Sequence, residues 1–124
     1  MIACDSSSLV AFLEGGAGPD VDAIVASVRG GELVIPPPVL TEILSNPRTH
    51  IVVGAAIASV PVLDVQSGFW RRAADARRRL LAKRLKARLA DALIAQSCID
   101  ANVALITRDR DFRHFAAHCG LKLA

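Results

Sequence analysis

The chain has 124 residues, of which 52% are hydrophobic and 22% charged, and its formal net charge is +3. This length and apolar content suit one compact core, so we expect a single domain over residues 1–124. The longest uncharged apolar run, IVVGAAIASVPVL, is too short to cross a bilayer, and the N-terminus lacks the pattern of a secretion signal. These features argue against a membrane or secreted protein, and we expect a soluble cytoplasmic one.

Three cysteines, Cys4, Cys98 and Cys119, lie far apart and form no C-x-x-C pair. This spacing indicates neither a disulfide framework nor a zinc site. We expect all three to be buried or inert thiols.

Positive charge is concentrated in one segment. Residues 71–88 hold nine of the fifteen Lys and Arg and a single acid, Asp75, whereas the rest of the chain has more acids than bases. Such a distribution favours a polyanionic partner that touches a restricted surface, and nucleic acid is the first candidate. The alternative is a solvated helix face without a partner.

The first part of the chain predicts strands that alternate with helices. MIACD is a short apolar strand that ends in Asp5, and SSSLVAFLEGG has serines at a helix start and glycines at its end. Residues 19–29 predict a second helix, because Pro and two acids come early and Arg comes last. ELVIP is then a second buried strand.

The middle of the chain continues this alternation. PVLTEILS predicts a helix that starts at the last of three prolines. Residues 49–59 predict an apolar helix, although the β-branched run IVV leaves a strand open, and VPVLDV predicts a third strand.

The last part predicts three helices and one or two strands. From Ser67 a long helix carries one apolar face, and ADALIAQSCIDAN is another helix with Asn102 as its stop. VALIT is a fourth strand, RDFRHFAAHC a final helix and LKLA a last short strand. The apolar face of the long helix consists of Phe69, Ala73, Ala76 and Leu80.

Short apolar strands that alternate with helices predict an α/β fold, with a central parallel sheet of four to five strands and helices on both faces. In such a sheet, functional groups gather where the strands end at their carboxyl edge. Asp5 and Asp109 lie at two such ends.

Two more acids, Glu42 and Asp91, stand in apolar contexts and do not resemble solvated surface acids. If all four acids converge, two carboxylates about 4 Å apart repel by about 4 kcal/mol, so the site needs a cation or shared protons. Hard oxygen ligands without clustered His or Cys favour Mg²⁺, with Mn²⁺ as a substitute. A metal held by carboxylates can deliver water and neutralise the charge that develops on a phosphodiester, which is one of the commonest uses of such clusters, and together with the basic segment this indicates a nuclease.

Each acid also has a structural interpretation. Asp5, Asp91 and Asp109 could each cap the helix that follows, and Glu42 could be paired with a basic side chain. Capping and metal binding are compatible, and four separate structural roles would have to coincide to explain the whole set.

The chain as a whole resembles a known family. The stretches MIACDSSSLVAFL, PPPVLTEIL, LADALIAQS and ALITRDRDF follow one another in the order and rough spacing of PIN-domain proteins, and the chain resembles a VapC-type toxin. None of these motifs is highly specific alone. The resemblance implies a three-layer α/β/α fold and a Mg²⁺-dependent endoribonuclease, the toxin of a type II toxin–antitoxin system, neutralised by a VapB-type antitoxin.

Position by position, the acids of the family fall on Asp5, Glu42, Asp91 and Asp109. The resemblance also places supporting residues at Ser7 and Thr107. Asn102 stands where a glycine is common, and the triple proline is unusual, but neither touches the acids. Asp111 is the outer acid, expected to cap or support the last helix, with metal water as a lesser alternative.

The expected reaction is hydrolysis of RNA, with Mg²⁺ held mainly by Asp5 and Asp91, while Glu42 and Asp109 position water or a second ion. Arg108 and Arg110 are expected to face RNA, a partner or solvent. The basic helix is expected to bind the RNA backbone, with candidate contacts at Arg78, Arg79, Lys83, Lys86 and Arg88.

Two other functions remain open. One is a non-catalytic module that binds nucleic acid or a partner on the same scaffold. The other is a phosphatase with Asp5 as nucleophile, although its usual companion acid is absent because Ser7 stands two residues later. The family resemblance also implies a homodimer or a toxin–antitoxin hetero-oligomer.

Overall fold

Three short strands form a parallel sheet at the centre of the molecule. The computed structural model describes residues 1–124 and contains β1 (Ile2–Cys4), β2 (Leu33–Val34) and β3 (Ala104–Ile106) in the order β2-β1-β3. The central β1 aligns Ile2 with Leu33 on one side and with Ala104 on the other. Because β3 comes about a hundred residues after β1, the sheet brings distant ends of the sequence together.

The sheet is smaller than the four to five strands expected. The predicted strand VPVLDV forms one isolated parallel bridge, Ile35 with Val62, and LKLA forms another, Leu105 with Leu123. Pro61 has no N–H to donate, so only its carbonyl oxygen bonds to the amide of Ile35, and Leu63 returns one bond to the Ile35 carbonyl. Both segments therefore extend the sheet at its edges without becoming full strands.

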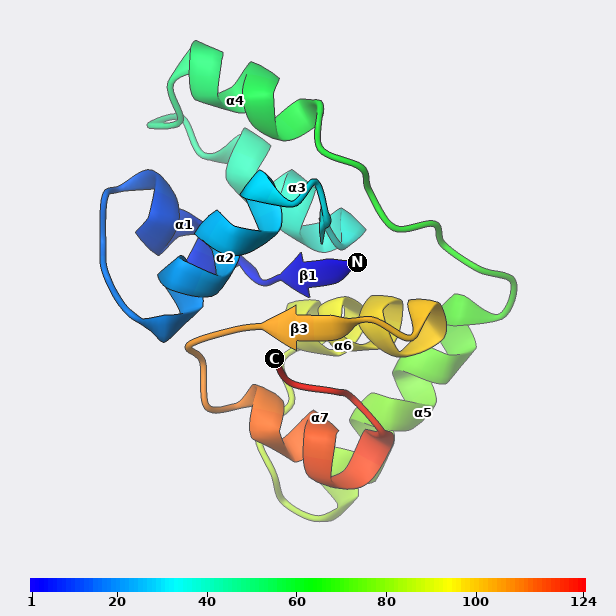
Figure 1. Ribbon diagram of the computed structural model, residues 1–124. Coiled ribbons are helices and arrows are strands. Elements are labelled where there is room, and N and C mark those ends of the chain that lie inside the picture. Colours follow the sequence, from blue (N-terminus) through cyan, green and yellow to red (C-terminus); the bar gives the residue numbers. More distant parts are fainter.

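Seven helices surround this sheet, and they follow the helices expected from the sequence (Figure 1). Residues 51–58 are helical, which decides between the two structures left open for that segment. Asn102 ends α6 in the left-handed conformation, with φ of 54°, as predicted. None of the helices is long and apolar enough to cross a membrane. They are α1 (Ser6–Leu13), α2 (Pro19–Arg29), α3 (Pro37–Ser45), α4 (Ile51–Ala58), α5 (Phe69–Ala82), α6 (Leu89–Ala101) and α7 (Phe112–Cys119).

Helix packing places α6 beside β3, whose carboxyl end leads into Asp109. In Figure 1, α6 runs behind β3, and the two elements are in contact. Helix α2 packs against β2 and β3, while α5 packs on α6 and α7 contacts both of them. The predicted apolar face of α5 is buried at all four of its positions, so burial of this face attaches α5 to the core.

The cysteines behave as expected from their spacing. Cys4 and Cys98 are buried and Cys119 is half-buried, and all three are free thiols. Burial raises the pKa of both Cys4 and Cys98 to about 12, so neither forms a reactive thiolate near neutral pH.

Candidate metal centre

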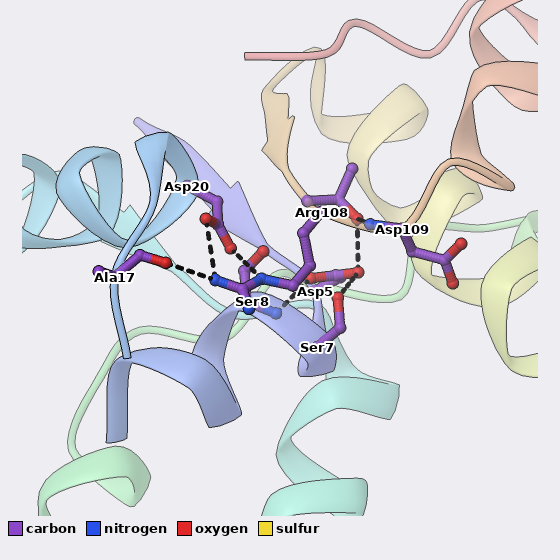
Figure 2. Close-up of polar contacts among 8 residues, drawn as sticks. Asp5, Ser7, Ser8, Ala17, Asp20, Arg108 and Asp109 are labelled. Atoms are coloured by element: carbon purple, nitrogen blue, oxygen red, sulfur yellow. Dashed lines mark hydrogen bonds and ion pairs between the residues drawn. The ribbon is translucent and has the colours of Figure 1, made fainter. Parts of the chain in front are cut away.

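Asp5 lies at the carboxyl end of β1 and is held by three hydrogen bonds. Its Oδ1 accepts from the backbone N–H of Ser8 at 3.0 Å, which makes Asp5 the N-cap of α1. Its Oδ2 accepts from the hydroxyl of Ser7 at 2.8 Å (Figure 2) and from the hydroxyl of Thr107 at 2.6 Å. Asp5 is only 3% exposed, so capping and orientation by two hydroxyls fix the direction of a buried carboxylate.

The exit from β3 is organised by local hydrogen bonds. The Thr107 hydroxyl that donates to Asp5 also accepts from the backbone N–H of Asp109 at 3.0 Å. The carboxylate of Asp109 in turn accepts from the backbone N–H of Asp111 at 2.9 Å. These bonds hold Asp109 and Asp111 in a fixed turn that starts where the strand ends.

Asp91, Asp109 and Asp111 form a cluster, and these three residues are called the carboxylate cluster below. Each offers a carboxylate oxygen, and the three oxygens lie within 4.8 Å of one another. Asp91 is the third residue of α6, so packing of α6 beside β3 brings it to the strand exit. The cluster could hold a metal ion.

The electrostatics of Asp91 fit a cation at this position. Its pKa is raised from 3.8 to about 6, first by burial and then by the negative charges of Asp109, Asp111 and Asp5, while Arg88 opposes the shift. Its Oδ2 is buried and has no hydrogen-bond partner. A hard divalent cation would satisfy this oxygen and offset the repulsion, and the donor set suits Mg²⁺ or Mn²⁺.

Asp111 belongs to this cluster, although from the sequence we expected it mainly to cap α7. It does occupy the N-cap position of α7, but its side chain makes no capping hydrogen bond. Instead, Asp111 Oδ2 lies 3.2 Å from the ammonium of Lys86. From the sequence, contact with a metal-bound water was the lesser alternative for Asp111, because the position of Asp91 opposite Asp111 depends on packing between α6 and α7.

Glu42 is not part of the carboxylate cluster. We expected it to be sheltered by apolar neighbours, but it is exposed, because Val39 and Ile43 form the buried face of α3 and Glu42 lies outside that face. It is also not among the acids that raise the pKa of Asp91. Its role in a metal site remains a prediction.

The basic segment, residues 71–88, divides into structural and free side chains. Arg72 donates to both carboxylate oxygens of Asp100, at 3.0 and 2.6 Å, and joins α5 to α6. Arg77 donates to the carbonyl of Ala87 at 2.8 Å. The alternative of a solvated helix face without a partner therefore does not describe all of these side chains, because two of the arginines form hydrogen bonds that connect α5 to α6 and to the loop between them.

The five candidate RNA contacts differ in their surroundings. Arg79 donates to the carbonyl of His118, and Lys86 pairs with Asp111. Arg88 acts on the pKa of Asp91, so it lies near the carboxylate cluster. All five, Arg78, Arg79, Lys83, Lys86 and Arg88, are exposed.

Arg108 is exposed, as expected of a side chain that faces solvent, but its guanidinium also forms contacts within the protein. Its guanidinium binds both carboxylate oxygens of Asp20, at 2.7 and 3.1 Å, and the carbonyl of Ala17 at 3.2 Å (Figure 2). The hydrogen bond from Arg108 is the main reason that the pKa of Asp20 is lowered to about 2. The side chains of Arg108 and Asp109 point to opposite sides of the chain (Figure 2). The ion pair between Arg108 and Asp20 therefore connects the exit from β3 to the start of α2.

Solved structures with this fold come from several bacteria. The structure described as VapBC2 from Rickettsia felis bound to a DNA fragment from its promoter matches with a TM-score of 0.73 and 18% identity, covering 100% of this chain and 98% of that one. FitAcB from Neisseria gonorrhoeae matches with a TM-score of 0.73 and 16% identity, over 99% and 96% of the two chains. A toxin–antitoxin complex from Klebsiella pneumoniae matches with a TM-score of 0.69 and 14% identity, over 98% and 95%.

Comparison with curated protein sequences finds no match. The sequence pattern of the PIN domain, however, matches residues 2–118, which is nearly the whole chain. The parallel sheet, its flanking helices and the acids at its carboxyl edge agree with that match. The chain therefore belongs to the PIN-domain family.

Proposed function

We propose that this protein is a metal-dependent endoribonuclease and the VapC-type toxin of a type II toxin–antitoxin system. The observation that carries the proposal is the carboxylate cluster, three acids within 4.8 Å at the end of β3, with Asp5 close enough to act on Asp91. Three carboxylates this close together, with the charge of Asp5 also acting on Asp91, repel one another unless a cation is bound, so a bound metal would explain why these acids are brought together.

In this proposal the cluster and Asp5 hold Mg²⁺ or Mn²⁺ in place. A bound ion would polarise the scissile phosphate and lower the pKa of a water molecule. Ser7 and Thr107 keep the Asp5 carboxylate in one orientation, and Thr107 also fixes the backbone of Asp109. The exposed bases of the basic segment contact the RNA backbone, so binding weakens as salt concentration rises.

A VapB-type antitoxin is the proposed partner. Two similar structures are described as VapBC2 and as a toxin–antitoxin complex, and both share this fold over almost their full length. The proposal extends that type of partner to this chain, in a toxin–antitoxin hetero-oligomer or a homodimer.

The function is tested by cleavage of RNA in the presence and absence of divalent metal. The purified protein is expected to cleave single-stranded RNA with Mg²⁺ or Mn²⁺ and to lose this activity in EDTA, because the carboxylates alone cannot neutralise charge on the phosphate. A small aryl phosphate serves as the control substrate and is expected to remain intact. Cleavage that persists in EDTA, or hydrolysis of the aryl phosphate instead of RNA, would contradict the proposal, and RNA binding without cleavage would favour the non-catalytic module.

The two aspartates after β3 are expected to differ in importance. Among the neighbouring charges, that of Asp109 has the largest effect on the pKa of Asp91, whereas the charge of Asp111 is partly offset by Lys86. Asp109→Asn is therefore expected to lower RNA cleavage by about 100-fold or more, and Asp111→Asn by about 10-fold. Single-turnover cleavage rates at saturating Mg²⁺ measure both losses, and a larger loss for Asp111→Asn would reverse this ranking.

A further inference from the structure

Lys86 is the only side chain that forms an ion pair with the carboxylate cluster. Its ammonium lies 3.2 Å from Asp111 Oδ2, and this pair joins the loop before α6 to the turn before α7. The cluster contains three carboxylates, and Lys86 supplies one positive charge, so the pair offsets only part of the repulsion.

The loop that carries Lys86 has a fixed backbone and a free side chain. Leu85 donates its backbone N–H to the carbonyl of Leu80 at 3.0 Å, and the carbonyl of Ala87 accepts from Arg77 at 2.8 Å. Ala87 is buried, whereas the side chain of Lys86 is 53% exposed. The backbone is thus anchored on both sides of Lys86, and only its flexible side chain has to move for the pair with Asp111 to open.

We propose that Lys86 competes with the divalent cation for Asp111, and that the ammonium released by metal binding contacts a phosphate of the RNA substrate. The inference rests on the proposed function and adds that Lys86 exchanges one anion, the Asp111 carboxylate, for another, an RNA phosphate. A lysine suits this role because its ammonium is a compact charge on a flexible stem that can leave one anion and bind another. Metal and lysine cannot both make close contact with Asp111 Oδ2 without repulsion between the two cations.

The test compares Lys86→Met with Lys83→Met, which removes the same charge from the same loop without breaking an ion pair. Calorimetric titration with Mg²⁺ in the absence of RNA is expected to give a Kd for Lys86→Met that is roughly 3- to 10-fold lower than that of the unmodified protein, because a competing cation has been removed. The Kd of Lys83→Met is expected to stay within about twofold. The difference should shrink at high ionic strength, since Lys86 is partly exposed.

RNA cleavage by Lys86→Met at saturating Mg²⁺ is expected to show a KM raised by roughly 10-fold with little change in kcat, because a phosphate contact has been lost. Lys86→Arg, which keeps the charge, is expected to restore both the KM and the Mg²⁺ affinity. If Lys86 has only a structural role, its replacement by methionine is expected to weaken Mg²⁺ binding or leave it unchanged. Either result would overturn the inference.

The inference and the proposed function can fail separately. If the unmodified protein binds Mg²⁺ but cleaves no RNA, the proposed function and the phosphate contact fail together, while the competition for Asp111 is still decided by the titration. If the protein cleaves RNA and Lys86→Met has an unchanged Kd for Mg²⁺, the inference alone is wrong. Urea unfolding of each variant verifies that it is folded.

Discussion

Replacing Asp91 with asparagine is expected to stabilise the metal-free protein and at the same time to remove its RNA cleavage. The carboxylate of Asp91 is half-buried, its Oδ2 has no partner, and burial followed by Asp109, Asp111 and Asp5 raises its pKa to about 6. A neutral amide of nearly the same shape removes the cost of burying this negative charge and its repulsion by the neighbouring carboxylates. It also removes a ligand that a bound cation would need.

The pH dependence of this gain follows from the direction of the pKa shift. The pKa in the folded protein, about 6, lies above the ordinary value of 3.8, so the ionised form is less favourable folded than unfolded. The loss of stability caused by ionised Asp91 is absent below about pH 4, and it grows until the pH passes the pKa of Asp91 in the folded protein. A shift of this size corresponds to about 3 kcal/mol, which we reduce to about 1 kcal/mol because half of the group remains accessible to solvent.

Urea unfolding in EDTA measures this prediction. At pH 8 the free energy of unfolding of Asp91→Asn is expected to exceed that of the unmodified protein by about 1 kcal/mol, and at pH 4.5 by less than half of that. Asp64→Asn, a change at an exposed acid, is the control and is expected to show neither effect. A variant that is less stable at pH 8, or a difference that grows as the pH falls, would contradict the explanation.

The same variant is expected to lose RNA cleavage by about 100-fold or more, which is at least the loss caused by groups that only orient metal ligands. Excess Mg²⁺ should stabilise the unmodified protein more than Asp91→Asn, because binding to the folded state alone shifts the unfolding equilibrium. A residue that lowers stability and yet is needed for activity is the pattern expected of a functional site.

Replacing Asp5 with asparagine is expected to abolish cleavage without any gain in stability. Asp5 accepts three hydrogen bonds, from Ser7, Ser8 and Thr107, so its charge is compensated in the folded protein, unlike that of Asp91. An asparagine can keep the cap on Ser8, because asparagine is as good an N-cap as aspartate. Its amide nitrogen, however, would face the two hydroxyls that now donate to Oδ2.

We expect Asp5→Asn to lower the free energy of unfolding by about 1 kcal/mol, the value of a typical hydrogen bond, and to keep the fold. Circular dichroism, urea unfolding and RNA cleavage at saturating Mg²⁺ measure the three quantities. Ser7→Ala is the matched control, because it removes one hydrogen bond and leaves the carboxylate, and its cleavage is expected to fall by about 10-fold, the lower end of the loss caused by groups that orient metal ligands. Full activity of Asp5→Asn would remove Asp5 from the site.

The sequence predicted the helices better than the strands of the sheet, because helices depend on neighbouring residues and strand pairing depends on residues far apart in the chain. The helix at 19–29 was predicted with its observed bounds, because periodicity and capping residues act over a few positions. The long helix was expected from Ser67 and starts at Phe69, but it ends at Ala82, so Lys83, Lys86 and Arg88 lie in the loop before α6 and not on the expected basic helix. The number of strands was overestimated, because an apolar run does not reveal how many hydrogen bonds a neighbouring strand can offer. Pro61 in the third predicted strand was the one available signal.

Among the site residues, the sequence by itself determined that Asp5 and Asp109 end parallel strands and that Asp91 lies in the first turn of a helix. These positions depend on local patterns along the chain. Only the tertiary structure decided that Asp111 joins Asp91 and Asp109, that Glu42 is exposed outside the carboxylate cluster, and that Arg108 pairs with Asp20. Each of these contacts depends on how α2, α3, α6 and α7 pack around the sheet, and the packing angles of helices are set by side chains far apart in the sequence.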